Sequence, residues 1–374
     1  MNIQKQKYVT SPYFQHCDNR PFENAWSIFP GDEPIRLNDE ELSLLRFCTK
    51  PIYYNQLLNV FSQESITKMI GYHFLTKYET AWHLNRLQSV EIETSKYCNW
   101  RCSFCPNKDN QNLQQKIMAN QLFLEILQKI QDFGSVNYVT LNTYNEPVLD
   151  PLFLERIQYL KKFNLKLILY TNGSALTNEM IQELKQSGCL QEIWFNVPSL
   201  QPERFKEITG YSHFNKVIAV VNKAIEAGLN VNFSIQGQTN ERQKTLTCIR
   251  EKYQEQIKHP IISWPTHDRA GNLKGEFNQN IHIKQNRLFG CNAVISQLHI
   301  NMCGDAFLCC NDYFQKHKFG NIQDASLFDL LNSENAIFLR KQVYGNTQAP
   351  DDLLCRHCIE MKRQMVLLKL IGGK

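Results

Sequence analysis

The sequence has no apolar run near the ~20 residues that a membrane-spanning helix needs, and residues 1–7 hold no apolar stretch typical of secretory signals. Charge of one sign is also scarce, because 41 Lys and Arg stand against 36 Asp and Glu, a formal net charge of +5. So small an excess over 374 residues predicts neither a nucleic-acid nor a membrane partner. We therefore expect a soluble cytoplasmic protein that binds no DNA and no membrane.

The composition does not indicate disorder or a fibrous repeat. Hydrophobic residues make up 43% of the chain and charged residues 21%, which are ordinary values for a folded protein. At roughly 150 residues per domain, a length of 374 residues predicts two or three domains with a substantial core.

Cysteine, by contrast, is abundant. Thirteen cysteines, an odd number in a long chain without a secretory signal, do not indicate a disulfide framework. In a reducing compartment such thiols are free to bind metal. They form two groups along the chain. The first is Cys98, Cys102 and Cys105, and the second is Cys291, Cys303, Cys309, Cys310, Cys355 and Cys358.

Residues 88–265 alternate strand-like and amphipathic helical stretches, which predicts right-handed βαβ units and a parallel sheet. The strand-like runs are residues 90–94, 138–141, 165–170, 193–197, 231–235 and 261–264. The helical stretches are residues 122–133, 152–163, 178–186 and 214–227, three of them closed by Gly134, Gly188 and Gly228. Six strands are too few for a complete eight-stranded barrel, so a partial barrel and a doubly wound sheet both remain open. In either, functional loops follow the carboxyl ends of the strands.

Residues 1–87 have a different character. Asn38, with Glu41 three residues later, predicts a capped helix, and residues 54–61 and 66–75 predict two more helices. Three short helices followed by a strand predict a winged-helix-like module. Residues 1–90 carry nine basic and nine acidic side chains, whereas duplex DNA binding needs a basic face. The neutral charge favours protein or peptide binding, or a plain packing role.

The first cysteine group directly follows the first predicted strand of the parallel sheet. Thiolates are soft ligands suited to iron–sulfur clusters or zinc. A structural zinc site needs four ligands, and no fourth Cys or His lies close downstream. Three cysteines on a cubane iron–sulfur cluster leave one iron open to a substrate or cofactor. There are two alternatives. One is a zinc site whose fourth ligand is the distant His73 or His83, and the other is that the three thiols only pack in the core.

This spacing, Cys-x3-Cys-x2-Cys with Phe104 before the last cysteine, resembles the signature of the radical S-adenosylmethionine (SAM) enzymes. Asn145-Glu146-Pro147 resembles the family's Gly-Glu-Pro motif at the amino group of SAM, and later strands also end in family-like motifs. The resemblance implies a [4Fe–4S] cluster on Cys98, Cys102 and Cys105. It implies SAM contacts from Phe104, Asn145, Glu146, Thr171, Asn172, Asn196, Ser199 and Arg269.

The second cysteine group resembles the auxiliary-cluster extension of these enzymes, called SPASM, in its shortened twitch form. The resemblance implies one auxiliary [4Fe–4S] cluster, held by Cys291, Cys309, Cys355 and Cys358. Cys303 and Cys310 are possible substitutes for Cys309. From spacing alone, a four-thiolate zinc ribbon is the alternative.

The resemblance also implies a domain organisation: a winged-helix-like module over residues 1–87, a partial (β/α)6 TIM-like barrel over 88–280 and a SPASM/twitch domain over 281–374. It implies a 5′-deoxyadenosyl radical that abstracts a substrate hydrogen, and an electron donor of the flavodoxin or ferredoxin type. An auxiliary cluster with no open iron suits an electron acceptor or relay, which favours net oxidation of the substrate.

Three functions follow as hypotheses. The first is an oxidoreductase that matures a ribosomally made peptide by a crosslink or similar linkage, with residues 1–87 binding the leader peptide. The second is a dehydrogenase of an aminocyclitol or sugar alcohol, a small-molecule substrate. The third is a zinc-stabilised regulatory or nucleic-acid-binding protein.

Overall fold

The structure is a computed structural model of the chain. It describes residues 5–16, 25–30, 32–109, 116–237, 239–253, 255–257, 261–265, 267–273, 280–284 and 288–361. Among these residues, none of the helices combines the length and the hydropathy that a membrane crossing requires.

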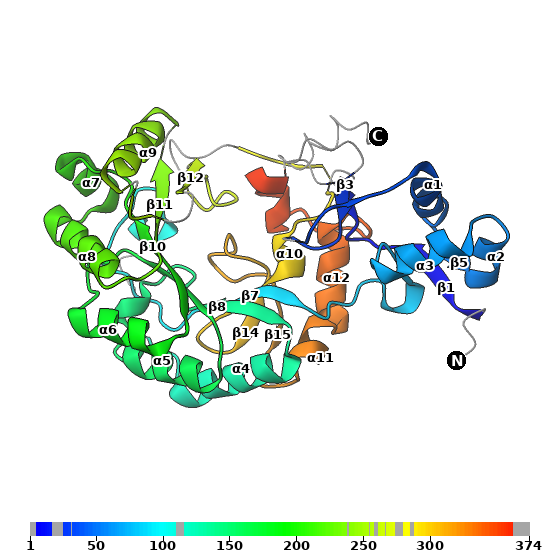
Figure 1. The fold of residues 1–374 in the computed structure, drawn as a ribbon, viewed down its shortest axis with the longest axis horizontal. Helices are drawn as coiled ribbons and strands as arrows, with labels where there is room; N and C mark the ends of the chain where they lie inside the picture. The colour runs from blue at the N-terminus through cyan, green and yellow to red at the C-terminus, as the bar shows by residue number, and fades with distance from the viewer. Residues whose placement is uncertain are drawn as a thin grey trace.

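Six parallel strands form the wall of a partial barrel (Figure 1). They are β7 (Leu87–Ile92), β8 (Val136–Thr140), β9 (Leu167–Thr171), β10 (Leu190–Asn196), β11 (Val231–Gly237) and β12 (Ile262–Pro265). Each overlaps one predicted strand. They pair in chain order, whereas a doubly wound sheet reverses its order at a switch point. The strand order therefore confirms the partial barrel and excludes the doubly wound sheet.

Helices cover the outer face of this wall (Figure 1). They are α4 (Asn120–Phe133), α5 (Phe153–Lys162), α6 (Asn178–Ser187), α7 (Pro202–Thr209), α8 (Phe214–Glu226) and α9 (Thr239–Tyr253). The four predicted helices are confirmed, and α7 and α9 were not predicted. Gly134, Gly188 and Gly228 take φ angles of 72°, 67° and 78°, the left-handed conformation that ends a helix at little cost for glycine.

A seventh parallel strand, β13 (Gln297–Ile300), pairs with β7 on the side away from β8. From there β14 (Asp305–Phe307) and β15 (Lys318–Asn321) extend the sheet with antiparallel pairing. The C-terminal segment also contains α10 (Ala293–Ser296), α11 (Leu327–Leu331), α12 (Glu334–Val343) and a 3-10 helix over Leu354–His357. The C-terminal segment therefore continues the barrel sheet.

The N-terminal module has two small antiparallel sheets and three helices. One sheet has the order β5-β1-β6, with β1 (Lys7–Thr10), β5 (Ile52–Tyr53) and β6 (Leu75–Lys77); the other has β2 (Gln15–His16), β3 (Ala25–Ser27) and β4 (Ile35–Arg36). The helices are α1 (Asp39–Phe47), α2 (Tyr54–Leu58) and α3 (Gln63–Gly71). Asn38 and Glu41 form the predicted capping box.

The predicted end of the third helix is wrong. We expected a helix over 66–75, but α3 stops at Gly71, His73 adopts a φ of +60°, and Leu75 begins β6. The module packs around its own apolar core, in which Leu44, Leu57 and Ile66 are fully buried. Figure 1 shows it beside α12, on the side away from α5 to α8. The domain limits at residues 87 and 280 stay predictions.

Candidate active site

The loop that carries the first cysteine group is fastened to α7. The backbone N–H of Arg101 donates to the carbonyl of Thr209 at 2.8 Å, and that of Ser103 donates to Ile208 at 2.8 Å. The Trp100 ring lies under this loop in an apolar cluster with Cys102 and other residues. Such packing fixes the backbone that presents the three thiols.

The three thiols open into a cavity of about 220 Å³ at the carboxyl ends of the barrel strands. This is where the sequence placed the functional loops. Most of the residues predicted to contact SAM also line it: Phe104, Asn145, Glu146, Thr171, Asn172, Asn196 and Arg269. The fold thus gathers predicted side chains from four further stretches of the sequence, residues 145–146, 171–172, 196 and 269, around Cys98, Cys102 and Cys105.

Glu146 is the centre of a buried hydrogen-bond network behind the thiols. Its carboxylate accepts hydrogen bonds from the Thr171 hydroxyl and the Asn172 backbone N–H, each at 2.6 Å. The side-chain amide of Asn172 donates to Asn99 at 2.9 Å and approaches the Cys98 sulfur at 3.9 Å. The network links the end of β9 to the cysteine loop, so acid and thiols hold fixed positions.

Burial dominates the electrostatics of the cavity. It raises the pKa of Glu146 to about 7, although the hydrogen bonds from Thr171 and Asn172 act in the opposite direction. Burial also raises the pKa of Cys98 to about 12 and that of Cys102 well above its ordinary value. Buried thiols of this kind become thiolates only when a cationic ligand compensates the charge, which is what a metal cluster supplies.

Several polar atoms that face the cavity find no hydrogen-bond partner among the described residues. They are Oδ1 of Asn142, the hydroxyl of Tyr144 and Oδ1 of Asn196. An unpaired buried polar group costs about 1–3 kcal/mol, and a bound ligand or water that supplies the missing hydrogen bond removes that cost. Three thiols, one acid and these atoms fit a cluster with a polar small molecule beside it.

Asn145 stands where the resembled motif has glycine. Its φ angle is not positive, so the backbone does not need glycine here. The side chain closes the turn instead, because Nδ2 donates to the Leu141 carbonyl at 3.0 Å and Oδ1 accepts from the Thr143 N–H at 3.1 Å. Phe104 is 5% exposed and packs in the apolar cluster beneath the cysteine loop.

Arg269 and Ser199 lie in different places. Arg269 lines the cavity with a φ of +52° and donates to the Gln236 side-chain oxygen at 3.3 Å. Ser199 is not among the residues that line it. Its hydroxyl accepts a hydrogen bond from the Gln201 N–H at 3.1 Å, ahead of α7. A contact from Ser199 to SAM stays a prediction.

Sequence reasoning missed several residues that line the cavity: Tyr144, Tyr170, Trp194, Ser234, Gln236 and Cys310. Ser234 and Gln236 are two apart on β11, and alternate residues of a strand share a face, so the strand period could have found them. Cys310 carried no such signal.

The second cysteine group is brought together by the fold. Cys291, Cys309, Cys355 and Cys358 share one apolar cluster with Leu288, Val343, Leu353 and others. Cys303 is exposed, and Cys310 lines the first cavity instead. Cys309 packs in this cluster, and Cys310 lies close enough to raise the pKa of Cys291, Cys309 and Cys358. The choice of Cys309 as the ligand stays a prediction.

Burial again raises the pKa of these thiols, to about 12 for Cys291 and well above the ordinary value for Cys309 and Cys355. Neighbouring thiols raise the pKa of Cys309 further. A thiolate donor set suits an iron–sulfur cluster or zinc. Within the described ranges, no three His, Cys, Asp or Glu side chains converge as ligands of a single ion.

Two family models match the chain. The radical SAM superfamily model matches residues 92–245, and the model of SPASM, an iron–sulfur cluster-binding domain, matches residues 291–359. The chain is a radical SAM protein with a C-terminal SPASM domain. Its radical SAM domain binds a [4Fe–4S] cluster and SAM, and its SPASM domain binds auxiliary iron–sulfur clusters. This family membership replaces the zinc alternatives for both cysteine groups.

Curated relatives of this radical SAM protein resemble it over part of their length. A probable GTP 3′,8-cyclase of Saccharolobus islandicus is 28% identical over 158 residues, which is 41% of this chain and 50% of the relative. A tungsten-containing aldehyde ferredoxin oxidoreductase cofactor-modifying protein of Pyrococcus furiosus is 32% identical over 102 residues, 27% and 28% of the two chains. The chain spans about half the length, or less, of these relatives.

Solved structures share the fold. SuiB of Streptococcus suis, bound to its precursor peptide SuiA, matches with a TM-score of 0.57 and 14% identity, over 88% of this chain and 90% of SuiB. anSMEcpe with AdoMet and the Cp18Cys peptide matches with a TM-score of 0.53 and 13% identity, over 76% of this chain and 98% of that one. At these identities the likeness concerns the fold alone.

Proposed function

We propose that this radical SAM protein is an oxidoreductase that modifies a ribosomally made peptide, forming a crosslink or a similar oxidised linkage. The observation that carries the oxidative part is the position of the second cysteine group next to the cavity. Cys310 lines the cavity, and the adjacent Cys309 belongs to the second group. A substrate radical in the cavity would lie close to an electron acceptor.

In the proposed reaction the residues of the cavity bind and orient. When bound, the cluster and SAM supply a 5′-deoxyadenosyl radical that abstracts a hydrogen atom. Cys98, Cys102 and Cys105 would hold the cluster, and Glu146, fixed by Thr171, would accept a hydrogen bond from the amino group of SAM. The rings of Tyr144, Tyr170 and Trp194, which line the cavity, would limit the access of water to the reacting atoms.

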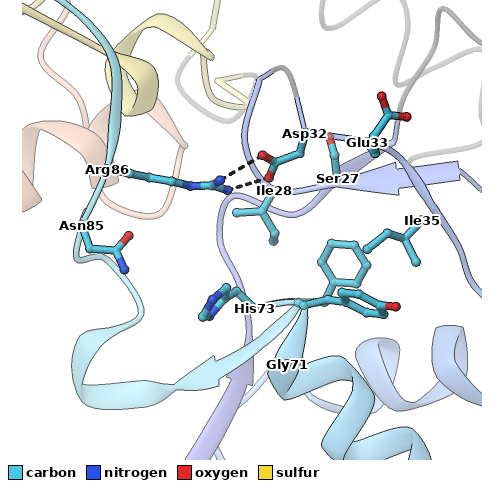
Figure 2. A pocket seen from close by; sticks show the side chains of 11 residues that line it. Ser27, Ile28, Asp32, Glu33, Ile35, Gly71, His73, Asn85 and Arg86 are labelled. Carbon is cyan, nitrogen blue, oxygen red and sulfur yellow. Dashed lines mark hydrogen bonds and ion pairs between the residues drawn. The ribbon is translucent and has the colours of Figure 1, made fainter. Parts of the chain in front are cut away.

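A further hollow supports the peptide part of the proposal. It measures about 390 Å³ and lies between β3, the end of α3 and the segment that enters the barrel. Figure 2 shows Arg86 reaching across it to Asp32, with Ile28 and Ile35 on its wall. The two terminal nitrogens of Arg86 donate to the two carboxylate oxygens of Asp32 at 2.9 and 2.6 Å. An apolar wall beneath a polar rim suits an extended peptide with one apolar anchor side chain.

The charge balance of the module points the same way, because residues 1–90 carry no basic excess that would favour nucleic acid. Two of the solved structures with this fold are complexes with peptides, SuiA in SuiB and Cp18Cys in anSMEcpe. We place the reaction in the reducing cytoplasm, where free thiols persist.

The test uses short peptides encoded beside the gene, incubated with the reconstituted, reduced protein and SAM under anaerobic conditions. We expect a product lighter by two hydrogens (about 2 Da), detected by mass spectrometry. An Ile28→Glu variant should bind the peptide at least about 10-fold more weakly and still form deoxyadenosine. Unchanged masses for every peptide, with deoxyadenosine still formed, would refute peptide oxidation.

A small-molecule dehydrogenase is the second candidate, and the polar wall of the cavity favours it. Ser234, Gln236 and Asn196 offer hydroxyl and amide groups of the kind that bind sugar hydroxyls. This candidate predicts oxidation of a free aminocyclitol or sugar alcohol and no effect of Ile28→Glu on turnover.

A further inference from the structure

A line of three aromatic rings runs from the cavity to the surface. The Tyr144 ring, on the cavity wall, meets the Tyr313 ring edge-on at 4.9 Å between centroids and an interplanar angle of 87°. Tyr313 meets Phe314 in the same manner at 5.0 Å and 82°. Phe314 is 63% exposed, the most exposed of the large hydrophobic side chains described. Two ring-to-ring steps therefore connect solvent with the cavity.

This line is fastened to the loop that carries the first cysteine group. Asn107 is 2% exposed, and its backbone N–H donates to the Cys105 sulfur. The Asn107 side chain donates to the Tyr144 carbonyl at 2.7 Å and accepts from the Tyr313 hydroxyl at 2.9 Å. One buried amide thus joins a cluster ligand to the first two rings of the line.

Hydrogen bonds fix the turn that carries Phe314, the exposed end of the ring line. The Asp312 carboxylate accepts hydrogen bonds from the backbone N–H groups of Lys316 and His317, each at 2.9 Å. Gln315, between them, has a φ of +52°, an unusual conformation for a residue that is not glycine. Its side chain donates to Glu93 at 3.0 Å and accepts from Asn301 at 2.9 Å. These hydrogen bonds fix the turn that carries Phe314 and Lys316.

The basic group beside Phe314 is Lys316, because Lys318 is already paired with Asp305. Lys316 Nζ lies 5.7 Å from the Phe314 ring centroid, and the exposed Lys318 follows two residues later. Lys318 pairs with Asp305 at 2.7 Å, while Asp312 is buried and occupied by backbone N–H groups. The whole chain also carries a net charge of +5. An acidic partner would be attracted to this surface and steered onto it.

We propose that Phe314 and Lys316 form the docking surface for a small acidic electron-transfer protein, and that its electron tunnels to the cluster beside Cys105 through the packed contacts of Phe314, Tyr313 and Tyr144, with no ring itself reduced. The donor loses one electron and the cluster on the first cysteine group gains one, so no proton or further reactant is needed. This inference rests on the bound cluster of the proposed function and adds the partner that reduces it.

The experiment compares two reductants with the reconstituted protein: a flavodoxin kept reduced by NADPH and its reductase, and dithionite, which needs no docking. We expect Phe314→Ala and Lys316→Glu to lower flavodoxin-driven deoxyadenosine formation at least about 5-fold and to raise the flavodoxin Kd, measured by calorimetry, by a similar factor. With dithionite, both variants should match the wild type. Phe338→Ala, which removes a 53% exposed ring from α12, is the control.

Three results would overturn the proposal. One is a Phe314→Ala variant that matches the wild type with flavodoxin. Another is an equal loss with flavodoxin and dithionite, which would make Phe314 a structural or substrate contact. The third is a wild-type protein that neither flavodoxin nor a ferredoxin reduces. A missing peptide product with normal dithionite-driven deoxyadenosine would instead refute the peptide substrate and leave the docking surface standing.

Discussion

The two cysteine groups of this radical SAM protein offer the same ligand atoms in opposite surroundings. The first lies on the wall of a cavity with a buried acid and unpaired polar atoms. The second has four thiols together in an apolar cluster, and it approaches the cavity where Cys309 is followed by Cys310. What surrounds the sulfurs, and how many there are, decides whether a cluster can accept a further ligand.

The different surroundings suit the two cysteine groups to different tasks. An open site must bind a small polar molecule, and so it keeps Glu146, Asn142 and Asn196 facing the thiols. A closed site has all its ligands from the protein and suits electron storage. Substitutions in the two cysteine groups should therefore cause different losses of activity.

Loss of a ligand at the first group should have the largest effect. We predict that Cys102→Ala abolishes deoxyadenosine formation, a decrease of at least about 1,000-fold, because no cluster then binds SAM. Iron content should fall by about half, from about eight to about four per chain. Cys248→Ala, which removes an exposed thiol on α9, should change neither value. Normal deoxyadenosine formation by Cys102→Ala would show that the first cysteine group does not hold the cluster that cleaves SAM.

Removing a thiol of the second group should lower product formation much more than it lowers SAM cleavage. We expect Cys355→Ala to retain deoxyadenosine formation within about 3-fold while product falls at least about 10-fold, because the substrate radical loses its electron acceptor. Anaerobic product analysis by mass spectrometry, with deoxyadenosine measured in the same sample, gives the ratio. Equal product from variant and wild type would exclude the relay role.

Cys309 and Cys310, adjacent in the chain, allow the two cysteine groups to be compared by single substitutions. Cys309 shares the apolar core with the other three thiols, whereas Cys310 lines the cavity. We predict that Cys309→Ala loses about four irons and that Cys310→Ala keeps all of them, since only the former removes a ligand. Iron analysis and the absorbance near 400 nm measure the difference. Iron loss from Cys310→Ala alone would reverse the assignment.

The sequence was sufficient where local patterns determine structure. Helix-ending glycines such as Gly134, the cap at Asn38 and the strand–helix alternation all correspond to elements of the fold. The signature around Cys98 also placed the cavity, because cysteines after a first strand must lie at the carboxyl edge of a parallel sheet.

The sequence did not predict the parts of the structure that depend on contacts between distant segments. Nothing in residues 297–300 indicates that β13 pairs with β7, about 200 residues earlier. The sequence favoured Cys309 and kept Cys303 and Cys310 as substitutes, and it gave no sign that Cys303 is exposed or that Cys310 lines the first cavity. The ring line from Tyr144 to Phe314 likewise depends on a tertiary contact that no periodicity encodes.

The smallest effect we predict concerns Glu146, the buried acid behind the first cysteine group. Burial raises the pKa of Glu146 to about 7 from an ordinary 4.5, so the folded cofactor-free protein keeps a proton that the unfolded chain releases. Its stability should therefore fall as pH rises from about 4.5 to 7, by up to about 3 kcal/mol from this group. Glu146→Gln cannot titrate, and the difference from wild type in free energy of unfolding should change over this window. Urea unfolding at pH 5 and pH 8 measures it, with the exposed Glu251→Gln on α9 as the control. A difference that is constant with pH would mean that Glu146 ionises normally despite its burial.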